Sequence, residues 1–296
     1  MIQLNEISPH GYGMALYSPD ILIDFLKAEK CRTKKLASYF DKNKDIFHKA
    51  IGNGVIMPIY RISINKYAIF ASVHESNISA PEGWEQVYKY DDFFIQVGNT
   101  NKLCWASFNF INDSKTAVEK RPTSEMEMVP HGYPSVMLPV HQAVDIDIPQ
   151  GYYHYDLIAY RRIEPLDESK QENAGRNFAY GFHFKSTNTM QNENLIKGDN
   201  ENDIHKYDIK HMEQRKIFTA EESKYIDFEK FYSIGDFTKL TFNNNKILYH
   251  LHDLEKGAFI GMDEKKRLYK ITRDEKITPI EETIVEYFSK EKTHAD

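Results

Sequence analysis

The stretch QAVDIDIPQGYYHYDLIAYRR (Gln142–Arg162) carries the clearest structural pattern in the chain. Its first half alternates apolar and acidic residues: Val144, Asp145, Ile146, Asp147 and Ile148. Side chains of a β-strand point alternately to opposite faces, so this period of two predicts a strand with a buried apolar face and a solvated acidic face. The next run, GYYHYDLIAYRRI, predicts a second β-rich segment.

Further β-rich runs lie upstream of this stretch. The runs GVIMPIYRIS, KYAIFASV, WEQVYKY, DFFIQVG and KLCWASFNFI predict an antiparallel meander, with a hairpin turn at Gly98–Asn101. Pro58 places the first run at an edge or a bulge, because proline cannot donate to a ladder. Two helical regions precede the meander, one after the Ser18-Pro19-Asp20 start signal and one from residue 32 to residue 54.

The length of 296 residues favours two domains. Residues 112–134 are polar, punctuated by proline and without periodicity, which predicts a linker. We therefore expect an N-terminal domain over residues 1–125, with two helices and the meander, and a β-rich C-terminal domain over residues 126–296. The C-terminal domain should end in a hairpin turning at Asp263–Lys266, then a helix with Pro279 in its first turn. The fold class is α+β: antiparallel β-sheets with a few packed helices.

Composition limits the classes of function. The chain has a net charge of −6, and its basic residues are scattered, which argues against nucleic acid as a partner. It has only two cysteines, Cys31 and Cys104, no signal-peptide pattern and no apolar run long enough for a membrane helix. These features predict a cytoplasmic protein with no membrane partner, and the acidic charge favours a basic partner.

Motifs for catalysis are missing from the sequence: no GxSxG, P-loop, GxGxxG or CxxC occurs. We therefore predict no catalytic residues, no cofactor and no metal. Two alternatives stay open. His250 and His252 have the spacing to share one strand face, as in a metal-dependent hydrolase. Trp84 and Trp105, with the tyrosine-rich strands, could instead form a carbohydrate- or ligand-binding β module.

Carboxylate clusters are the strongest candidates for a binding surface, because they agree with the net charge. Asp145 and Asp147 form the acidic face of the alternating strand. Asp91 and Asp92 lie between two aromatic residues that could act as anchors. The predicted partner-binding residues are Tyr90, Asp91, Asp92, Phe93, Asp145 and Asp147.

The C-terminal forty residues resemble the ends of several bacterial toxin-immunity proteins and are loosely similar to SMI1/KNR4-type (SUKH) immunity domains. The matching residues are Gly257, Gly261, Asp263, Leu268, Tyr269, Ile271, Thr272, Asp274, Thr283, Ile284 and Phe288. The stretch quoted first is similar, over about twenty residues, to a strand pair in nuclease inhibitors of the competence protein J group.

This resemblance implies an antitoxin for interbacterial competition: a cytoplasmic immunity protein that is not an enzyme and occludes a cognate toxin. The expected toxin is basic. A nuclease is the first expectation, and an NAD-consuming or ADP-ribosylating enzyme is the second.

Overall fold

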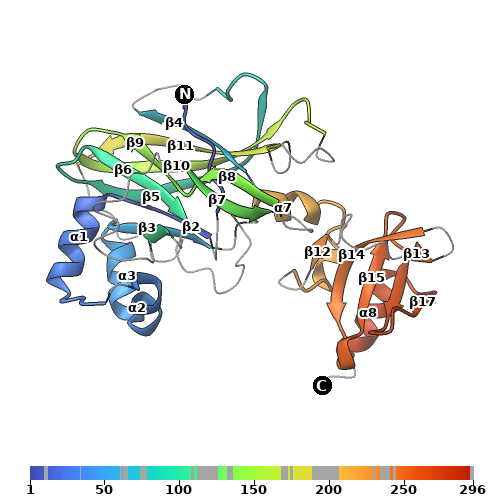
Figure 1. The fold of residues 1–296 in the computed structure, drawn as a ribbon. Helices are drawn as coiled ribbons and strands as arrows, with labels where there is room; N and C mark the ends of the chain where they lie inside the picture. Colours follow the sequence, from blue (N-terminus) through green and yellow to red (C-terminus); the bar gives the residue numbers. More distant parts are fainter. Residues whose placement is uncertain are drawn as a thin grey trace. The chain divides into compact units, whose positions relative to one another are not determined.

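The structure is a computed structural model of the chain, with two compact units, Met1–Ile209 and Lys210–Asp296. It describes residues 1–9, 13–33, 35–60, 62, 66–73, 79–107, 110–111, 126–131, 136–167, 173, 176–188, 207–228, 231–233, 241–242 and 245–293. Both units combine helices with mostly antiparallel sheets, which confirms the predicted α+β class (Figure 1).

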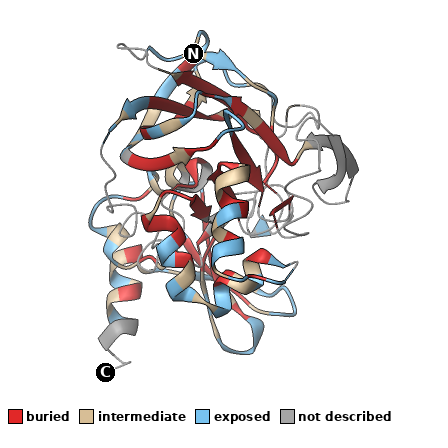
Figure 2. Ribbon diagram, turned by 90° about the vertical axis from the view of Figure 1, so that its left-hand side faces the viewer, coloured by how far each residue is buried: buried red, intermediate tan, exposed pale blue. Residues whose placement is uncertain are grey.

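Three helices of the first unit confirm the two helical regions expected from the sequence. They are α1 (Pro19–Ala28), α2 (Leu36–Lys42) and α3 (Lys44–Gly52). Each buries one apolar side, and Leu22, Leu26, Phe40 and Phe47 join the main hydrophobic core. In Figure 2 these helices show alternating buried and exposed positions, whereas the strands are buried over long stretches.

A five-stranded sheet forms the larger layer of the first unit. Its strand order is β1 (Ile2–Gln3), β4 (Ala68–Val73), β11 (Phe178–Thr187), β10 (Gly151–Arg162) and β5 (Trp84–Val97). The β4–β11 pair is parallel, and the other pairs are antiparallel. The predicted runs WEQVYKY and DFFIQVG are therefore one long strand, β5, interrupted by a bulge at Asp91 and Asp92 opposite Asp156.

A four-stranded sheet forms the second layer, in the order β3 (Ile56–Tyr60), β2 (Gly13–Tyr17), β6 (Lys102–Ser107) and β9 (Ala143–Asp147). The two sheets share one core, where the rings of Trp105 on β6 and Phe182 on β11 lie 4.9 Å apart. Pro58 lies on β3, an edge strand, as predicted. A separate hairpin pairs β7 (Met126–His131) with β8 (Val136–His141).

The predicted meander is wrong, because strands that are neighbours in sequence belong to different sheets. Gly98–Asn101 is a turn, with Asn101 N–H donating to Gly98 O, but it carries the chain from β5 in one sheet to β6 in the other. Asn101 also joins this turn to the return crossing from β9 to β10. Its backbone carbonyl accepts from Ile148 N–H at 3.0 Å and its side chain accepts from Gln150 N–H at 2.8 Å.

The two units divide the chain elsewhere than the predicted boundary at residues 125 and 126. Strands from either side of that boundary pair with one another, β5 with β10 and β6 with β9, so they belong to the same unit. Within the predicted linker, residues 126–131 form strand β7, while residues 112–125 and 132–134 lie outside the described residues. The first unit ends where helix α7 (Ile209–Arg215) begins.

The second unit contains a sheet in the order β12 (Tyr232–Ser233), β14 (Asn245–Asp253), β15 (Phe259–Asp263), β16 (Leu268–Ile271) and β17 (Ile277–Ile280), with β13 (Thr241–Phe242) paired to β14. Two short 3₁₀ turns, η2 (Glu222–Lys224) and η4 (Glu255–Gly257), connect the elements. The predicted hairpin turn is confirmed, since Lys266 N–H donates to Asp263 O.

The last helix, α8 (Ile284–Thr293), starts later than predicted. Pro279 and Ile280 belong to β17, so they are not in the helix's first turn. Thr283 caps the helix instead, because its hydroxyl accepts from Glu286 N–H and its own N–H donates to the Glu286 carboxylate at 2.9 Å. Ile284 and Phe288 are buried against the sheet, as expected.

Candidate partner-binding surface

Strand β9 displays the predicted acidic side chains Asp145 and Asp147. Val144, Ile146 and Ile148 are 2–3% exposed and belong to the core, which confirms the alternation. Asp147 is exposed, and Asp145 is half-buried. We call these two carboxylates the acidic edge, because β9 is the last strand in its sheet among the described residues.

The basic neighbour of the acidic edge is Lys102 on β6. Its Nζ lies 3.2 Å from Asp145 Oδ2, and both side chains are partly exposed. The hydrogen bond and the charge of Asp145 raise the pKa of Lys102. An exposed pair of this kind contributes little to stability, so Asp145 can exchange Lys102 for another cation at little cost.

The second predicted acidic group lies at the bulge of β5. Asp91 is exposed and pairs with Lys89, whose Nζ also lies 3.2 Å from Asp156 Oδ2. Hydrogen bonding to Asp91 is the main reason that the pKa of Lys89 is raised. The side chain of Asp92 lies outside the described residues. The bulge therefore binds its own lysine, as Asp145 of the acidic edge binds Lys102.

The aromatic residues expected beside this acidic pair do not form an exposed anchor. Phe93 is 1% exposed and stacks on Tyr155 with ring centroids 5.2 Å apart. Tyr90 is partly buried and packs edge-to-face on Tyr207 at 4.8 Å. Because β5 is covered on this face by the core, Phe93 is a packing residue, and its predicted role as a binding anchor is corrected.

A buried polar row crosses the opposite face of the five-stranded sheet, and sequence patterns gave no sign of it. Ser72 on β4, His183 on β11 and Asp156 on β10 occupy adjacent register positions and are all at most 6% exposed. Ser72 Oγ and His183 Nδ1 are 2.8 Å apart. The three residues come from strands far apart in sequence, so only the sheet order brings them together.

The polar row has the residue types of a nucleophile, a base and an orienting carboxylate. A catalytic site of this type needs an accessible nucleophile, but Ser72 is 4% exposed and His183 is 0% exposed. We therefore assign the row to the interior of the unit, where Ser72 bonds to His183 and Asp156 pairs with Lys89 and Lys185.

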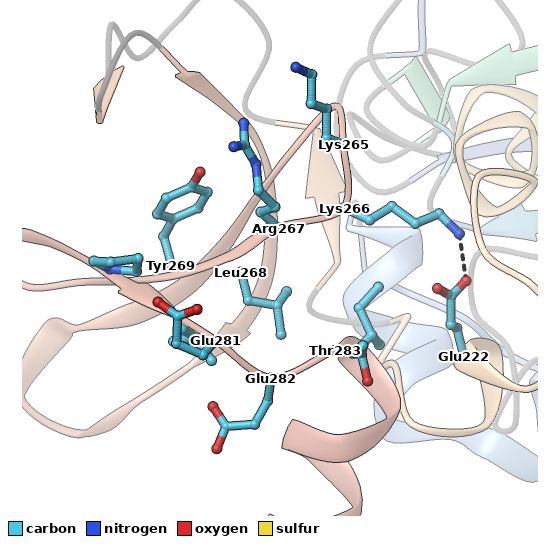
Figure 3. Close-up of a pocket in the computed structure, with 12 residues that line it drawn as sticks. Glu222, Lys265, Lys266, Arg267, Leu268, Tyr269, Glu281, Glu282 and Thr283 are labelled. Carbon is cyan, nitrogen blue, oxygen red and sulfur yellow. Dashed lines mark hydrogen bonds and ion pairs between the residues drawn. The ribbon is translucent and has the colours of Figure 1, made fainter.

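A pocket of about 750 Å³ lies in the second unit (Figure 3). Its lining combines the turn residues Lys265, Lys266 and Arg267 with Glu281 and Glu282 and with apolar residues such as Leu268 and Ile284. Lys266 Nζ reaches Glu222 at 2.7 Å, drawn as the dashed line in Figure 3.

The charged residues that line this pocket have both signs, and most of them form ion pairs. Arg267 pairs with Asp263, and Glu282 pairs with Lys290 at 3.3 Å. The pocket therefore favours neither a cation nor an anion.

The motif that resembles immunity domains is accounted for by packing in this unit. The buried Asp263 carboxylate accepts hydrogen bonds from Lys265 N–H and Arg267 N–H, and from the side chains of Arg267 and Tyr269. A Cβ on Gly261 would come within 2.7 Å of Ile247 and Ile271. These residues determine the hairpin, so each of them has a structural role in this unit.

The two alternative sites receive no support from the geometry. A register shift in β14 separates His250 and His252: His250 stacks on Phe259 at 4.8 Å, whereas His252 contacts Phe288 of α8 on the other face. The assumption that both share one strand face is therefore wrong. In the described part of the chain, no group of three or more His, Cys, Asp or Glu side chains is placed to hold a metal ion.

Neither tryptophan presents an open platform for a sugar. Trp105 is fully buried between the sheets. Trp84 is 6% exposed, and the guanidinium of Arg162 covers its ring at 4.6 Å.

Comparisons with known proteins add no relative. No protein-family model, curated protein or solved structure matches the chain significantly. Of the helices in the described residues, none is long and apolar enough to cross a membrane.

Proposed function

We propose that the protein is a cytoplasmic immunity protein, which catalyses nothing itself and inhibits a basic bacterial toxin by binding over its active surface. The observation that carries the proposal is the acidic edge, Asp145 and Asp147 on β9, displayed by a strand whose other face lies in the core. The resemblance of the C-terminal segment to immunity domains supports the class of partner.

The distribution of charge supports a partner that docks on the first unit. Residues 1–209 carry 27 acidic and 22 basic residues, whereas residues 210–296 carry 17 and 16. Most of the net charge of −6 therefore belongs to the unit that holds the acidic edge. A nuclease is the first candidate toxin, because a surface that binds polyanionic nucleic acid is itself basic. A toxin that consumes NAD or transfers ADP-ribose is the second candidate.

The direct test uses the toxin encoded beside the gene for this chain. The purified proteins should form a stable complex in size-exclusion chromatography, and toxin activity should be lost at equimolar ratio. Assays of nucleic-acid cleavage and of NAD loss distinguish the two toxin classes. If the two proteins do not associate, the proposal is wrong.

The acidic edge makes a kinetic prediction. Asp145→Lys combined with Asp147→Lys should slow association with the toxin about tenfold or more at low salt, and less at high salt, because the variant reverses the attracting charge. Thermal stability should barely change, since neither side chain is in the core. Stopped-flow association across salt concentrations measures the effect.

The matched control is Asp24→Lys combined with Asp41→Lys, two exposed positions on α1 and α2. It changes the net charge by the same amount at a different place. Equal slowing by both double variants would mean that only total charge matters, and unchanged rates in both would make the acidic edge ordinary solvated surface.

A further inference from the structure

The outer edge of β9 has hydrogen-bonding groups directed away from the sheet. Ser107 N–H donates to Gln142 O at 2.8 Å, and Ile148 N–H donates to Asn101 O at 3.0 Å, both in the β6–β9 register. Antiparallel ladders alternate between bonded and non-bonded pairs. The even-numbered residues of β9 therefore bond to β6, and the N–H and C=O groups of Asp145 and Asp147 point outward.

The other edge strands of four or more residues in the described part of the chain contain a proline or a bulge, including β7 with Pro130 and β8 with Pro139. In the second unit, Thr272 N–H donates to Lys276 O, so the even-numbered residues of β17 bond to β16. The nitrogen of Pro279 therefore faces outward, where proline has no N–H to donate. Strand β3 has Pro58 at its centre. Strand β5 is bulged, and Gln96 N–H is bonded to Gly54 O at 2.8 Å. Proline and bulges are the usual means of blocking edges, and β9 has neither.

The two carboxylates select what can pair with this edge. Ser8 N–H donates to His141 O just before β9, and Ala143 is 1% exposed, so among the described residues the accessible part of the edge is Asp145 and Asp147. The Cβ atoms of directly opposite residues in an antiparallel pair lie about 4.5–5.5 Å apart. At this distance two opposite charges, one on each strand, can form an ion pair. A second copy of β9 would place carboxylate against carboxylate and is repelled. A strand with lysine or arginine at positions i and i+2 is attracted.

We propose that β9 accepts an extended strand of the partner protein, with Lys or Arg at two alternate positions opposite Asp145 and Asp147. Backbone hydrogen bonds to the outward groups fix the register, and the two ion pairs give the charge selectivity. The incoming cation replaces Lys102 as the ion-pair partner of Asp145. This inference rests on the proposed function, because it specifies how the basic partner docks.

The test uses a synthetic peptide that alternates lysine with valine and threonine, added to the full chain and followed by amide hydrogen exchange. We expect slower exchange at Asp145 and Asp147. A second peptide with the same side chains, but with backbone N-methyl groups on the edge facing β9, should bind about tenfold or more weakly, since it cannot form the ladder.

A protein variant completes the test. Asp145→Asn with Asp147→Asn should weaken binding of the first peptide about tenfold or more, while Asp24→Asn with Asp41→Asn should leave it unchanged. Equal binding of both peptides, or protection at other residues only, would overturn strand pairing and leave the proposed function standing. Failure of the intact toxin to bind is the separate result that removes the proposed function.

Discussion

At the scale of single residues, Asp263 shows how a buried carboxylate becomes part of a turn. It is 1% exposed, yet its two oxygens accept four hydrogen bonds from residues that follow it in the hairpin. Burial by itself would raise its pKa, but the hydrogen bonds from Arg267, Tyr269 and Lys265 outweigh burial and lower the pKa. The ionised form is therefore the form that holds the turn.

This residue gives a prediction with a defined pH dependence. A lowered folded-state pKa means that Asp263 stabilises the fold above its unfolded pKa of about 3.9 and loses that contribution as pH falls through the folded value. Asp263→Asn should cost about 1–3 kcal/mol at pH 7, because it leaves buried donors poorly paired. The difference from wild type should shrink towards pH 3 in urea unfolding.

Glu264→Gln is the matched control for this prediction, since Glu264 is exposed at the same turn. It should leave stability within about 0.5 kcal/mol at both pH values. A cost for Asp263→Asn that is the same at pH 7 and pH 3 would show that ionisation of this carboxyl is not the cause.

At the scale of elements, the turn between β5 and β6 is tied to the start of α1. Asp20 accepts from the Ser18 hydroxyl at 2.7 Å and from Thr100 N–H at 3.1 Å, and a Cβ on Gly98 would lie 2.2 Å from its carboxylate. Gly98→Ala should therefore destabilise the chain by about 1–3 kcal/mol. The same substitution in an Asp20→Ala background should cost clearly less, because the clash is gone. Equal costs in both backgrounds, measured by urea unfolding, would contradict this account.

The elements also show what the sequence alone could predict. Alternation placed Val144, Ile146 and Ile148 inside and the aspartates of β9 outside, because that pattern is local. Local pattern does not show which strands pair, so the prediction of a meander was wrong. For the same reason the sequence did not place Asp156 beside Asp91. The neighbouring positions of His183 and Ser72 were not predictable either, because they depend on the register between two strands that are distant in sequence.

At the scale of the whole molecule, each unit has a hydrophobic core of its own. The first is centred on residues such as Trp105 and Phe182, and the second on residues such as Leu251, Ile260 and Phe288. A fragment of residues 210–296 should therefore fold without the rest of the chain. Circular dichroism and a cooperative melt of the fragment test this, and Asp263→Asn should destabilise it as it does the full chain. A fragment without a cooperative transition would show that the second unit depends on the first.

The parallel pair of β4 and β11 has a consequence for biosynthesis. Strand β4 ends at Val73, but β11, which covers its open side, ends at Thr187. At about 5–20 residues added per second, a ribosome takes roughly 5–25 s to supply the missing strand. During that time the N–H and C=O groups of β4 that later bond to β11 have no strand to pair with, which is the condition that favours aggregation of an edge. Chaperone demand should therefore be greatest while residues 74–187 are being translated, and chains cut short before β11 should aggregate.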